Sequence, residues 1–255
     1  MATRLGIDIG GTGIKGAPVD TTTGELVAPR FRIPTPHPAT PSAVAQTVAE
    51  IAGHFDWTGP TGATFPAVVK DGVTQTAANV DPTWIGADAA KVLSDATGAP
   101  VTVINDADAA GLAEMEFGAA KGRQDTVIVV TLGTGIGSAL FSRGHLVPNT
   151  ELGHLQIRGK DAEHRAAESV REELNLSWKK WARRLNEYFG HLEALLWPDL
   201  IVIGGGVSKK SDKFLPLLMT RAEVVPAQLL NEAGIVGAAV VTQHEAWART
   251  DAPSP

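Results

Sequence analysis

Apolar residues along this chain fall into short runs that alternate with segments of helical spacing. Runs typical of buried strands cover residues 5–10, 14–19, 25–33, 61–65, 101–104, 126–132, 138–142, 145–147 and 200–203, and residues 68–73 form a turn at Asp71-Gly72. Helical spacing covers residues 42–55, 86–97, 107–117, 162–173, 177–196 and 234–247. Strands that alternate with helices predict an α/β protein.

The two halves of the chain begin in the same way. Residues 5–19 show a strand, a glycine loop and a second strand, and residues 126–142 repeat this order without repeating the residues. Such a pattern predicts an internal structural duplication. We expect two α/β lobes with a cleft between them, formed by residues 1–108 with a C-terminal helix over 238–255, and by residues 109–237.

The composition narrows the class of protein. Of 255 residues, 44% are apolar and 20% charged, as in an ordinary globular core. No apolar run approaches the ~18–20 residues of a membrane span, and residues 1–4 contain no apolar signal core, so we expect a cytoplasmic protein. The formal charge of -6 argues against a general nucleic-acid binder. The absence of cysteine excludes disulfides, thiolate catalysis and cysteine-ligated zinc.

Two glycine loops follow buried strands. The first, residues 10–16, fits the G-x-G-x-x-G pattern of dinucleotide-binding proteins, but that pattern opens a helix and these glycines lead into a strand. No Walker-type G-x-x-x-x-G-K-[ST] occurs. Glycine turns between strands let backbone amides approach a phosphate, so two Gly-Thr-Gly loops predict phosphate binding. The loop residues concerned are Gly10, Gly11, Thr12, Gly13, Lys15, Gly133, Thr134, Gly135 and Gly137.

The ordered motifs resemble the ROK family of sugar kinases and repressors. D-I-G-G-T-G-I-K-G at 8–16 and L-G-T-G-I-G-S-A at 132–139 are similar to its two phosphate loops, and E-L-G-H at 151–154 is similar to its E-x-G-H sugar motif. Asn105-Asp106 resembles its catalytic pair, and I-V-I-G-G-G-V-S at 201–208 its nucleotide-side glycine motif. The resemblance implies a duplicated actin/hexokinase-like (ribonuclease H-like) fold, phosphoryl transfer to a hexose, and a homodimer.

The resemblance also suggests a role for each residue. Asp106, at the end of a strand where open α/β sheets bind ligands, is the candidate general base, although it could instead cap the following helix. Asp8 is placed to hold Mg²⁺ through water. The candidate hexose-binding residues are Asn79, Asn105, Asp106, Glu151, His154 and Glu163, with Glu168 as a rival of Glu163. Gly204, Gly205, Gly206 and Lys209 join the loops as donor-binding candidates.

The chain departs from most of the family after E-L-G-H, where a cysteine-rich zinc element is usual and residues 155–168 are short and charged. We therefore expect no zinc. A zinc-free, compact chain resembles the actinobacterial members that use inorganic polyphosphate, so we expect polyphosphate, ATP or both as donor. The cations expected near the phosphate-binding turns are Lys15, Lys121, Arg123, Lys209, Lys210 and Lys213, and the alternative is that these are ordinary solvated side chains.

Other functions are compatible with part of this pattern. A strictly ATP-dependent hexokinase shares all the motifs, and a non-catalytic sugar sensor shares the sugar residues. An actin-like filament protein shares the phosphate loops but has no need of E-L-G-H. A repressor of the family carries a helix-turn-helix domain before the first loop, and because seven residues precede Asp8 we expect a kinase. Glucose and mannose both remain open as the acceptor.

Overall fold

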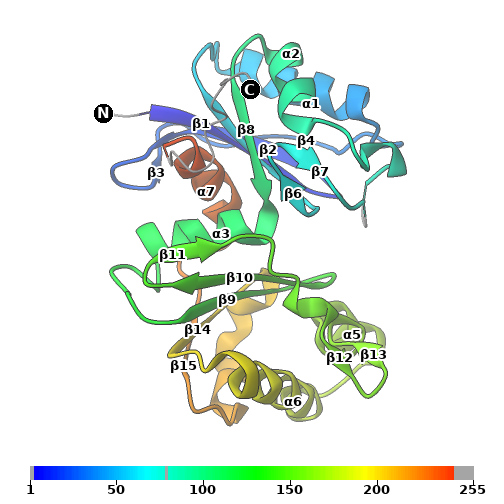
Figure 1. Cartoon of the computed structure of the whole chain (residues 1–255), viewed down its shortest axis with the longest axis vertical. Helices are drawn as coiled ribbons and strands as arrows, with labels where there is room; N and C mark the ends of the chain where they lie inside the picture. Colours follow the sequence, from blue (N-terminus) through cyan, green and yellow to red (C-terminus); the bar gives the residue numbers. More distant parts are fainter. Residues whose placement is uncertain (1–2, 78–79, 244–255) are drawn as a thin grey trace, which may run out of the picture. The chain divides into compact units, whose positions relative to one another are not determined.

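The computed structural model describes residues 3–77 and 80–243, which form two compact units (Figure 1). The first unit comprises the described residues up to Ala109 together with those from Gly234 onward, and the second is Ala110–Ala233. Asn79, a candidate sugar ligand, lies outside the described residues. Among the described helices, none combines the length and the apolar character that crossing a membrane requires.

The first unit contains a mixed sheet with strand order β3-β2-β1-β5-β8, in which β4 also pairs with β2. β2 pairs antiparallel with β1, β3 and β4, whereas β5 pairs parallel with β1 and β8 pairs parallel with β5. A small hairpin, β6 (Val69–Lys70) and β7 (Val73–Thr74), turns at Asp71 and Gly72 as predicted. The bounds of the sheet strands are β1 Thr3–Ile9, β2 Ile14–Asp20, β3 Glu25–Leu26, β4 Phe31–Ile33, β5 Thr61–Phe65 and β8 Val101–Asn105.

The second unit repeats this arrangement with strand order β11-β10-β9-β14-β15. β9, β10 and β11 form an antiparallel meander, and β14 and β15 follow in parallel on the other side of β9. The duplication predicted from the sequence is therefore confirmed at the level of strand order. The strand bounds are β9 Val127–Leu132, β10 Ile136–Ser142, β11 His145–Val147, β14 Leu200–Gly204 and β15 Glu223–Pro226.

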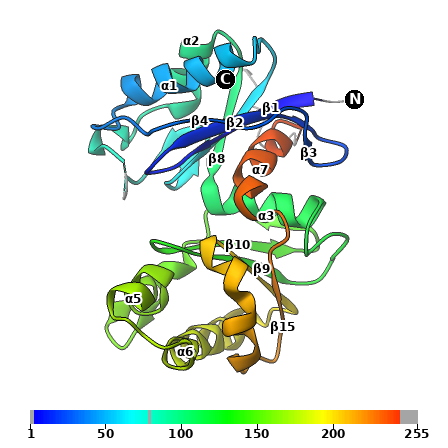
Figure 2. The ribbon, with the colours of Figure 1, turned by 180° about the vertical axis from the view of Figure 1, so that it is seen from behind.

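Helices cover both faces of the first sheet. A Cβ on Gly16 would lie 2.8 Å from Ile51 of α1 (Pro41–His54), so α1 packs on the face that carries Gly16. Gly6 points to the opposite face of the sheet from Gly16, and a Cβ on Gly6 would lie 1.9 Å from the carbonyl oxygen of Ile235 in α7 (Ala233–Val241). Helix α7 therefore lies against the other face (Figure 2). The remaining helical segments here are η1 Pro82–Trp84 and α2 Ala89–Thr97.

The return of the chain to the first unit begins earlier than the predicted residue 238. Ile235 contacts Gly6 of β1, and a Cβ on Gly62 of β5 would lie 1.6 Å from the carbonyl oxygen of Ala238. A Cβ on Gly237 would lie 1.8 Å from the carbonyl oxygen of Ala109 in α3 (Asp106–Glu116). Because these glycines bring the backbones so close, α7 belongs to the first unit from Gly234 onward.

In the second unit, the long helix α6 (Trp178–Leu196) covers the buried strands β9 and β14. Ser177 caps it by accepting from the Lys180 N–H, and Trp181, Leu185 and Tyr188 pack against the sheet residues. The shorter elements of this unit are η2 Leu152–His154, β12 Gln156–Ile157, β13 Lys160–Asp161, α4 Glu163–Ala166, α5 Glu168–Glu173, η3 Gly206–Lys213, η4 Leu215–Leu217 and η5 Leu230–Glu232.

Two expected elements are split in the structure. The strand predicted over 25–33 is interrupted around Pro29, which has no N–H for the ladder, and forms β3 and β4 separately. The helix predicted over 162–173 breaks at Ala167, whose ψ is 155°. The second piece, α5, begins beside the second glycine loop, because the N–H of Ser169 donates to the carbonyl of Gly133 at 3.1 Å.

Candidate functional site

Asp8 stands at the carboxyl end of β1, just before the first glycine loop. Thr64 of β5 donates its hydroxyl to Asp8 Oδ1 at 2.8 Å, and the ammonium of Lys15 lies 3.1 Å from Oδ2. A Cβ on Gly234 would lie 2.7 Å from the same carboxylate, so only glycine leaves room for it there. The strand pairing thus brings together two of the predicted residues, Asp8 and Lys15, which are opposite each other in the β1–β2 register.

Arg32 was not among the residues predicted for this loop. It lies on β4 opposite Lys15, and its Nη2 donates to the carbonyl of Thr12 at 2.7 Å. A Cβ on Gly13 would lie 2.4 Å from the guanidinium, so the glycine is what allows Arg32 to cover the loop. The sequence gives no local signal for this contact, because it depends on β4 pairing with β2 rather than continuing β3.

Asn105 and Asp106 mark the junction between β8 and α3. The Asn105 side chain is buried; its Oδ1 accepts from the N–H groups of Ala107 and Asp108 at 2.8 and 3.1 Å, and its Nδ2 donates to the Ala67 carbonyl at 3.0 Å. Asn105 is therefore the helix cap. Asp106 is the first helical residue, is exposed, and accepts from the Ala107 N–H at 2.9 Å.

The second and third glycine motifs lie at adjacent strand ends in the second unit. Gly204 of β14 pairs with Thr131 of β9, so the two motifs follow neighbouring parallel strands. Gly205 has a φ of 84°, and a Cβ there would lie 2.2 Å from the carbonyl oxygen of Leu132. This close approach and the left-handed backbone both require glycine. The predicted donor-binding residues of these two motifs therefore follow the carboxyl ends of two neighbouring inner strands.

The E-L-G-H segment forms a 3-10 turn held on β10. Ser138 Oγ accepts from the Leu152 N–H at 3.0 Å and donates to the Thr150 carbonyl. A Cβ on Gly153 would lie 2.2 Å from the carbonyl oxygen of Ile136, so the third position of the motif must be glycine. Glu151 and His154 lie on either side of this close approach to the strand.

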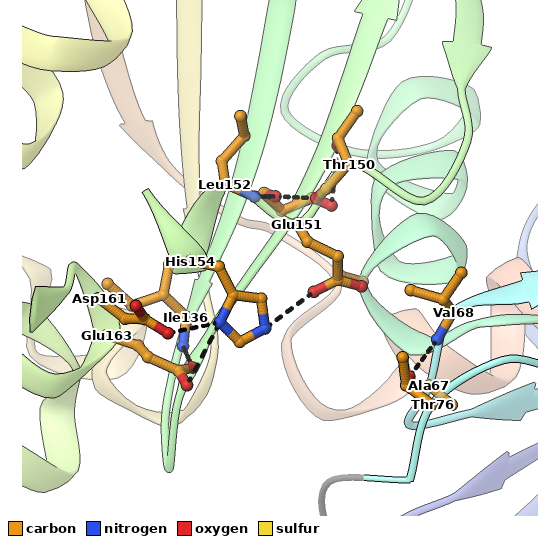
Figure 3. Close-up of polar contacts among 12 residues, drawn as sticks. Ala67, Val68, Thr76, Ile136, Thr150, Glu151, Leu152, His154, Asp161 and Glu163 are labelled. Carbon is orange, nitrogen blue, oxygen red and sulfur yellow. Dashed lines mark hydrogen bonds and ion pairs between the residues drawn. The ribbon is translucent and has the colours of Figure 1, made fainter. Parts of the chain in front are cut away.

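His154 lies between acidic side chains on both sides of its ring. Its Nδ1 is 2.9 Å from Asp161 Oδ2 and 4.0 Å from Glu163 Oε1, and its Nε2 is 3.9 Å from Glu151 Oε2 (Figure 3). The hydrogen bond with Asp161 raises the pKa of His154, with Glu163 and Glu151 adding to the effect. The same bond lowers the pKa of Asp161, whereas burial raises the pKa of Glu151.

Glu163 and Glu168 occupy different places. Glu163 Oε2 accepts from the Ile136 N–H at 3.3 Å, next to Gly135, and its other oxygen faces His154. Glu168 lies near Gly206, where a Cβ would be 3.8 Å from its Oε2, and burial raises its pKa. The structure therefore brings Glu163 to the other candidate sugar residues of this unit and places Glu168 beside the third glycine motif.

Not all of the predicted cations lie near the phosphate-binding turns. Lys209, Lys210 and Lys213 are exposed on η3, which begins at Gly206. The prediction is wrong for Arg123, which pairs with Asp125 at 2.7 Å and with Glu223 at 3.2 Å. Glu223 begins β15 and Arg123 precedes β9. Arg123 therefore lies at the end of β9 opposite the second glycine loop, and β9 spans roughly 20 Å.

One group of side chains in the described ranges could accept a metal ion. Ligand atoms of His154, Asp161 and Glu163 all lie within 4.8 Å of one another. The set contains no thiolate, and structural zinc is usually held by four ligands rich in cysteine and histidine. The Nδ1 of His154 is moreover already engaged by Asp161 at 2.9 Å. The absence of zinc stays a prediction.

Comparison with known proteins relates the chain to sugar kinases. The model of the ROK family matches residues 4–170. The polyphosphate glucokinase of Mycobacterium tuberculosis is 52% identical over 239 residues, which cover 93% of this chain and 90% of that protein.

Two solved structures are also similar. The inorganic polyphosphate/ATP-glucomannokinase from Arthrobacter sp. strain KM has a TM-score of 0.91 and 51% identity, with 96% of this chain and 100% of that one covered. A ROK family glucokinase from Streptomyces griseus, in complex with glucose and AMPPNP, has a TM-score of 0.80 and 25% identity, with 95% and 100% covered. These likenesses confirm the predicted actin/hexokinase-like fold.

Proposed function

We propose, from the premise that this chain belongs to the ROK family, that it is a polyphosphate glucokinase: it transfers the terminal phosphoryl group of inorganic polyphosphate to the 6-hydroxyl of glucose. ATP is proposed as a second donor and mannose as a second acceptor, because the similar Arthrobacter enzyme is a polyphosphate/ATP-glucomannokinase. The observation that carries the proposal is the 52% identity with a polyphosphate glucokinase over 93% of the chain.

Asp106 is proposed to take the proton of the acceptor hydroxyl. Phosphoryl transfer requires alignment of donor and acceptor, neutralisation of phosphate charge and removal of one proton. Asp106 is exposed at the first position of α3. Asn105 beside it is buried, and its side chain donates to the Ala67 carbonyl and accepts from the Ala107 N–H. A carboxylate presented on a rigid strand-to-helix junction suits a general base.

Mg²⁺ is proposed to bind near Asp8. The carboxylate is partly exposed, with 19% of the side chain accessible, and supplies the hard oxygen ligand that this ion prefers together with water. Thr64 donates to Oδ1 and so orients the carboxylate, which fits an ion held through water, whereas the ammonium of Lys15, 3.1 Å from Oδ2, competes with the ion for that oxygen. When bound, Mg²⁺ would neutralise charge on the donor phosphates.

The hexose is proposed to be bound by Glu151, His154 and Glu163, with Asn105, Asp106 and Asn79. Glu151 and Glu163 both face the imidazole ring of His154. A site whose polar groups pair with sugar hydroxyls discriminates strongly against ligands that leave those groups unpaired. Asn105 uses its carbonyl oxygen for the helix cap and one amide N–H for Ala67, which leaves its second amide N–H for a hydroxyl.

The donor is proposed to bind at the glycine motifs and at the lysines of η3. The glycines of these three motifs place no Cβ in the way of a phosphate, and the N–H groups of Gly10 and Gly133 donate to the carbonyls of Gly13 and Gly135, which closes the first two loops. Lys209, Lys210 and Lys213 follow on the 3-10 helix η3, where all three are exposed. A polyanion with about one charge per phosphate gains more from such a row of cations than a nucleotide does.

A coupled assay for the hexose 6-phosphate product, which is glucose 6-phosphate from glucose and mannose 6-phosphate from mannose, tests this proposal with polyphosphate and ATP as separate donors. Product with polyphosphate supports it, and product with ATP alone would favour the strictly ATP-dependent hexokinase. Binding of glucose without turnover on either donor would instead indicate a sugar sensor. We also propose a cytoplasmic homodimer, for which light scattering should give twice the mass of the chain.

A further inference from the structure

We infer that Asp161 positions His154 for sugar binding: its carboxylate accepts the Nδ1 proton of the imidazole, so that Nε2 is turned toward Glu151 and the sugar (Figure 3). This inference rests on the proposed function for the identity of the ligand. It adds a residue that the motifs do not contain, since Asp161 lies beyond E-L-G-H in the charged segment that follows it.

A two-residue hairpin places Asp161. β12 and β13 pair antiparallel, with Gln156 opposite Asp161 and Ile157 opposite Lys160. The turn residues Arg158 and Gly159 have φ values of 52° and 75°, the left-handed pair that joins strands through a tight hairpin. Because neighbouring strand residues face opposite sides, a slip of one residue would turn Asp161 away from His154.

Both oxygens of Asp161 have partners. Oδ2 lies 2.9 Å from His154 Nδ1, and Oδ1 accepts from the amide of Gln156, its neighbour across the hairpin. The side chain is 25% exposed, whereas that of His154 is 56% exposed. The carboxylate is therefore held from the hairpin side and bonds an imidazole whose other edge is open to a ligand.

The chemistry of the contact decides which ring nitrogen carries a proton. An ionised carboxylate only accepts hydrogen bonds, so the Nδ1 next to Asp161 must donate. A neutral ring then presents its Nε2 as an acceptor, and a protonated ring presents it as a donor. The other charged groups that face the ring are Glu151 near Nε2 and Glu163 near Nδ1, and His164 lies 3.9 Å from Glu163.

The first test determines which ring nitrogen of His154 carries the proton, and it needs no substrate. In long-range ¹⁵N–¹H spectra of the full chain, the His154 signals are those lost in His154→Gln. We expect Nδ1 of His154 to be protonated in the wild type, and this preference to be lost in Asp161→Ala and weakened in Asp161→Asn. Spectra of His154 that do not change in either variant would overturn the inference, whether or not the chain phosphorylates glucose.

The second test is kinetic. Asp161→Asn should raise the KM for glucose by roughly tenfold, the scale of a lost hydrogen bond to a charged group, with kcat and the KM for polyphosphate little changed. Asp161→Glu keeps an acceptor carboxylate and should restore part of the glucose affinity. Glu173→Gln removes an exposed carboxylate of α5 as the matched control and should leave all constants unchanged.

Two results would contradict the positioning role. An equal loss of glucose and polyphosphate affinity in Asp161→Asn, without rescue by Asp161→Glu, would show only a general structural effect. A stoichiometric metal ion bound through both Asp161 and His154 in purified protein would replace the direct hydrogen bond. Failure of the wild type to use glucose, with the ring signals behaving as expected, would overturn the proposed function and leave the Asp161–His154 contact in place.

Discussion

Asn105 caps the helix whose first residue is Asp106, accepting from the N–H groups of Ala107 and Asp108 at 2.8 and 3.1 Å. Capping was the alternative explanation for Asp106, and the neighbouring asparagine performs it. Asp106 also accepts from the Ala107 N–H at 2.9 Å, so both side chains contribute to the start of α3, and the general-base role of Asp106 stays a prediction.

Asp106→Asn should lower kcat by roughly 10²–10⁴, the range expected for loss of a general base, with a modest change in glucose affinity. Asn105 still caps the helix, so the free energy of unfolding should change little. Steady-state kinetics and denaturant unfolding check the two expectations, with Asp95→Asn on α2 as an exposed-carboxylate control. Turnover near that of the wild type would exclude Asp106 as the base.

Gly153→Ala tests the packing of the E-L-G-H turn. The new Cβ would meet the Ile136 carbonyl at 2.2 Å, so Glu151 and His154 must move. We expect a loss of about 1–3 kcal/mol of stability and a higher KM for glucose. Gly190→Ala on α6 is the matched control, because no atom lies within 4 Å of its Cβ, and it should be neutral or slightly stabilising. Equal behaviour of the two variants would contradict this packing.

Much of the fold could be predicted because local patterns determine it. The glycine loops, the turn at Asp71-Gly72 and the helix expected over residues 42–55 all follow from nearby residues. The hairpin of β12 and β13 was missed because strands of two residues carry no period. The split of 25–33 depends on which strand each piece pairs with, which local propensity does not determine.

The candidate site was predicted in part for the same reason. Motif residues such as Glu151 and His154 are close in sequence and in space, whereas Arg32 and Asp161 reach their partners only through strand pairing. Arg123 was misplaced because it precedes a strand that ends in a glycine loop. A strand separates its two ends in space, so proximity in sequence to the start of β9 says nothing about the loop at its end.

The raised pKa of His154 predicts a pH dependence of stability. A group whose pKa is higher in the folded state stabilises the fold below its ordinary pKa of about 6.5 and loses this contribution as pH rises through the raised value. As the pH rises above about 6.5, the free energy of unfolding of the wild type should therefore fall relative to that of His154→Gln. Parallel pH curves for the two proteins would show that the ring gains no stabilising charge contact in the fold.

Zinc should be absent from the purified protein. His154 has no thiolate partner, since the chain contains no cysteine. Protein washed with a chelator should contain far less than one zinc per chain by elemental analysis and should keep its activity when Mg²⁺ is restored. Stoichiometric zinc that resists the wash would contradict this prediction and would point to His154, Asp161 and Glu163 as its ligands.

Replacement of Lys209, Lys210 and Lys213 by alanine should raise the KM for long polyphosphate more than that for ATP. It should also flatten the dependence of the polyphosphate KM on salt, because fewer ions are released on binding. The kinetics are measured at two salt concentrations, with Lys121→Ala, in the turn before β9, as the control. An unchanged KM and salt dependence for polyphosphate would remove these lysines from the donor site.

The most direct measurement is ³¹P NMR of the reaction of the wild-type chain with glucose, Mg²⁺ and long-chain polyphosphate, with no nucleotide present. The account predicts a growing phosphomonoester signal of glucose 6-phosphate that matches an added standard, while Asp106→Asn under the same conditions gives almost none. No ester signal from polyphosphate, with a clear one when ATP replaces it, would contradict the proposed donor.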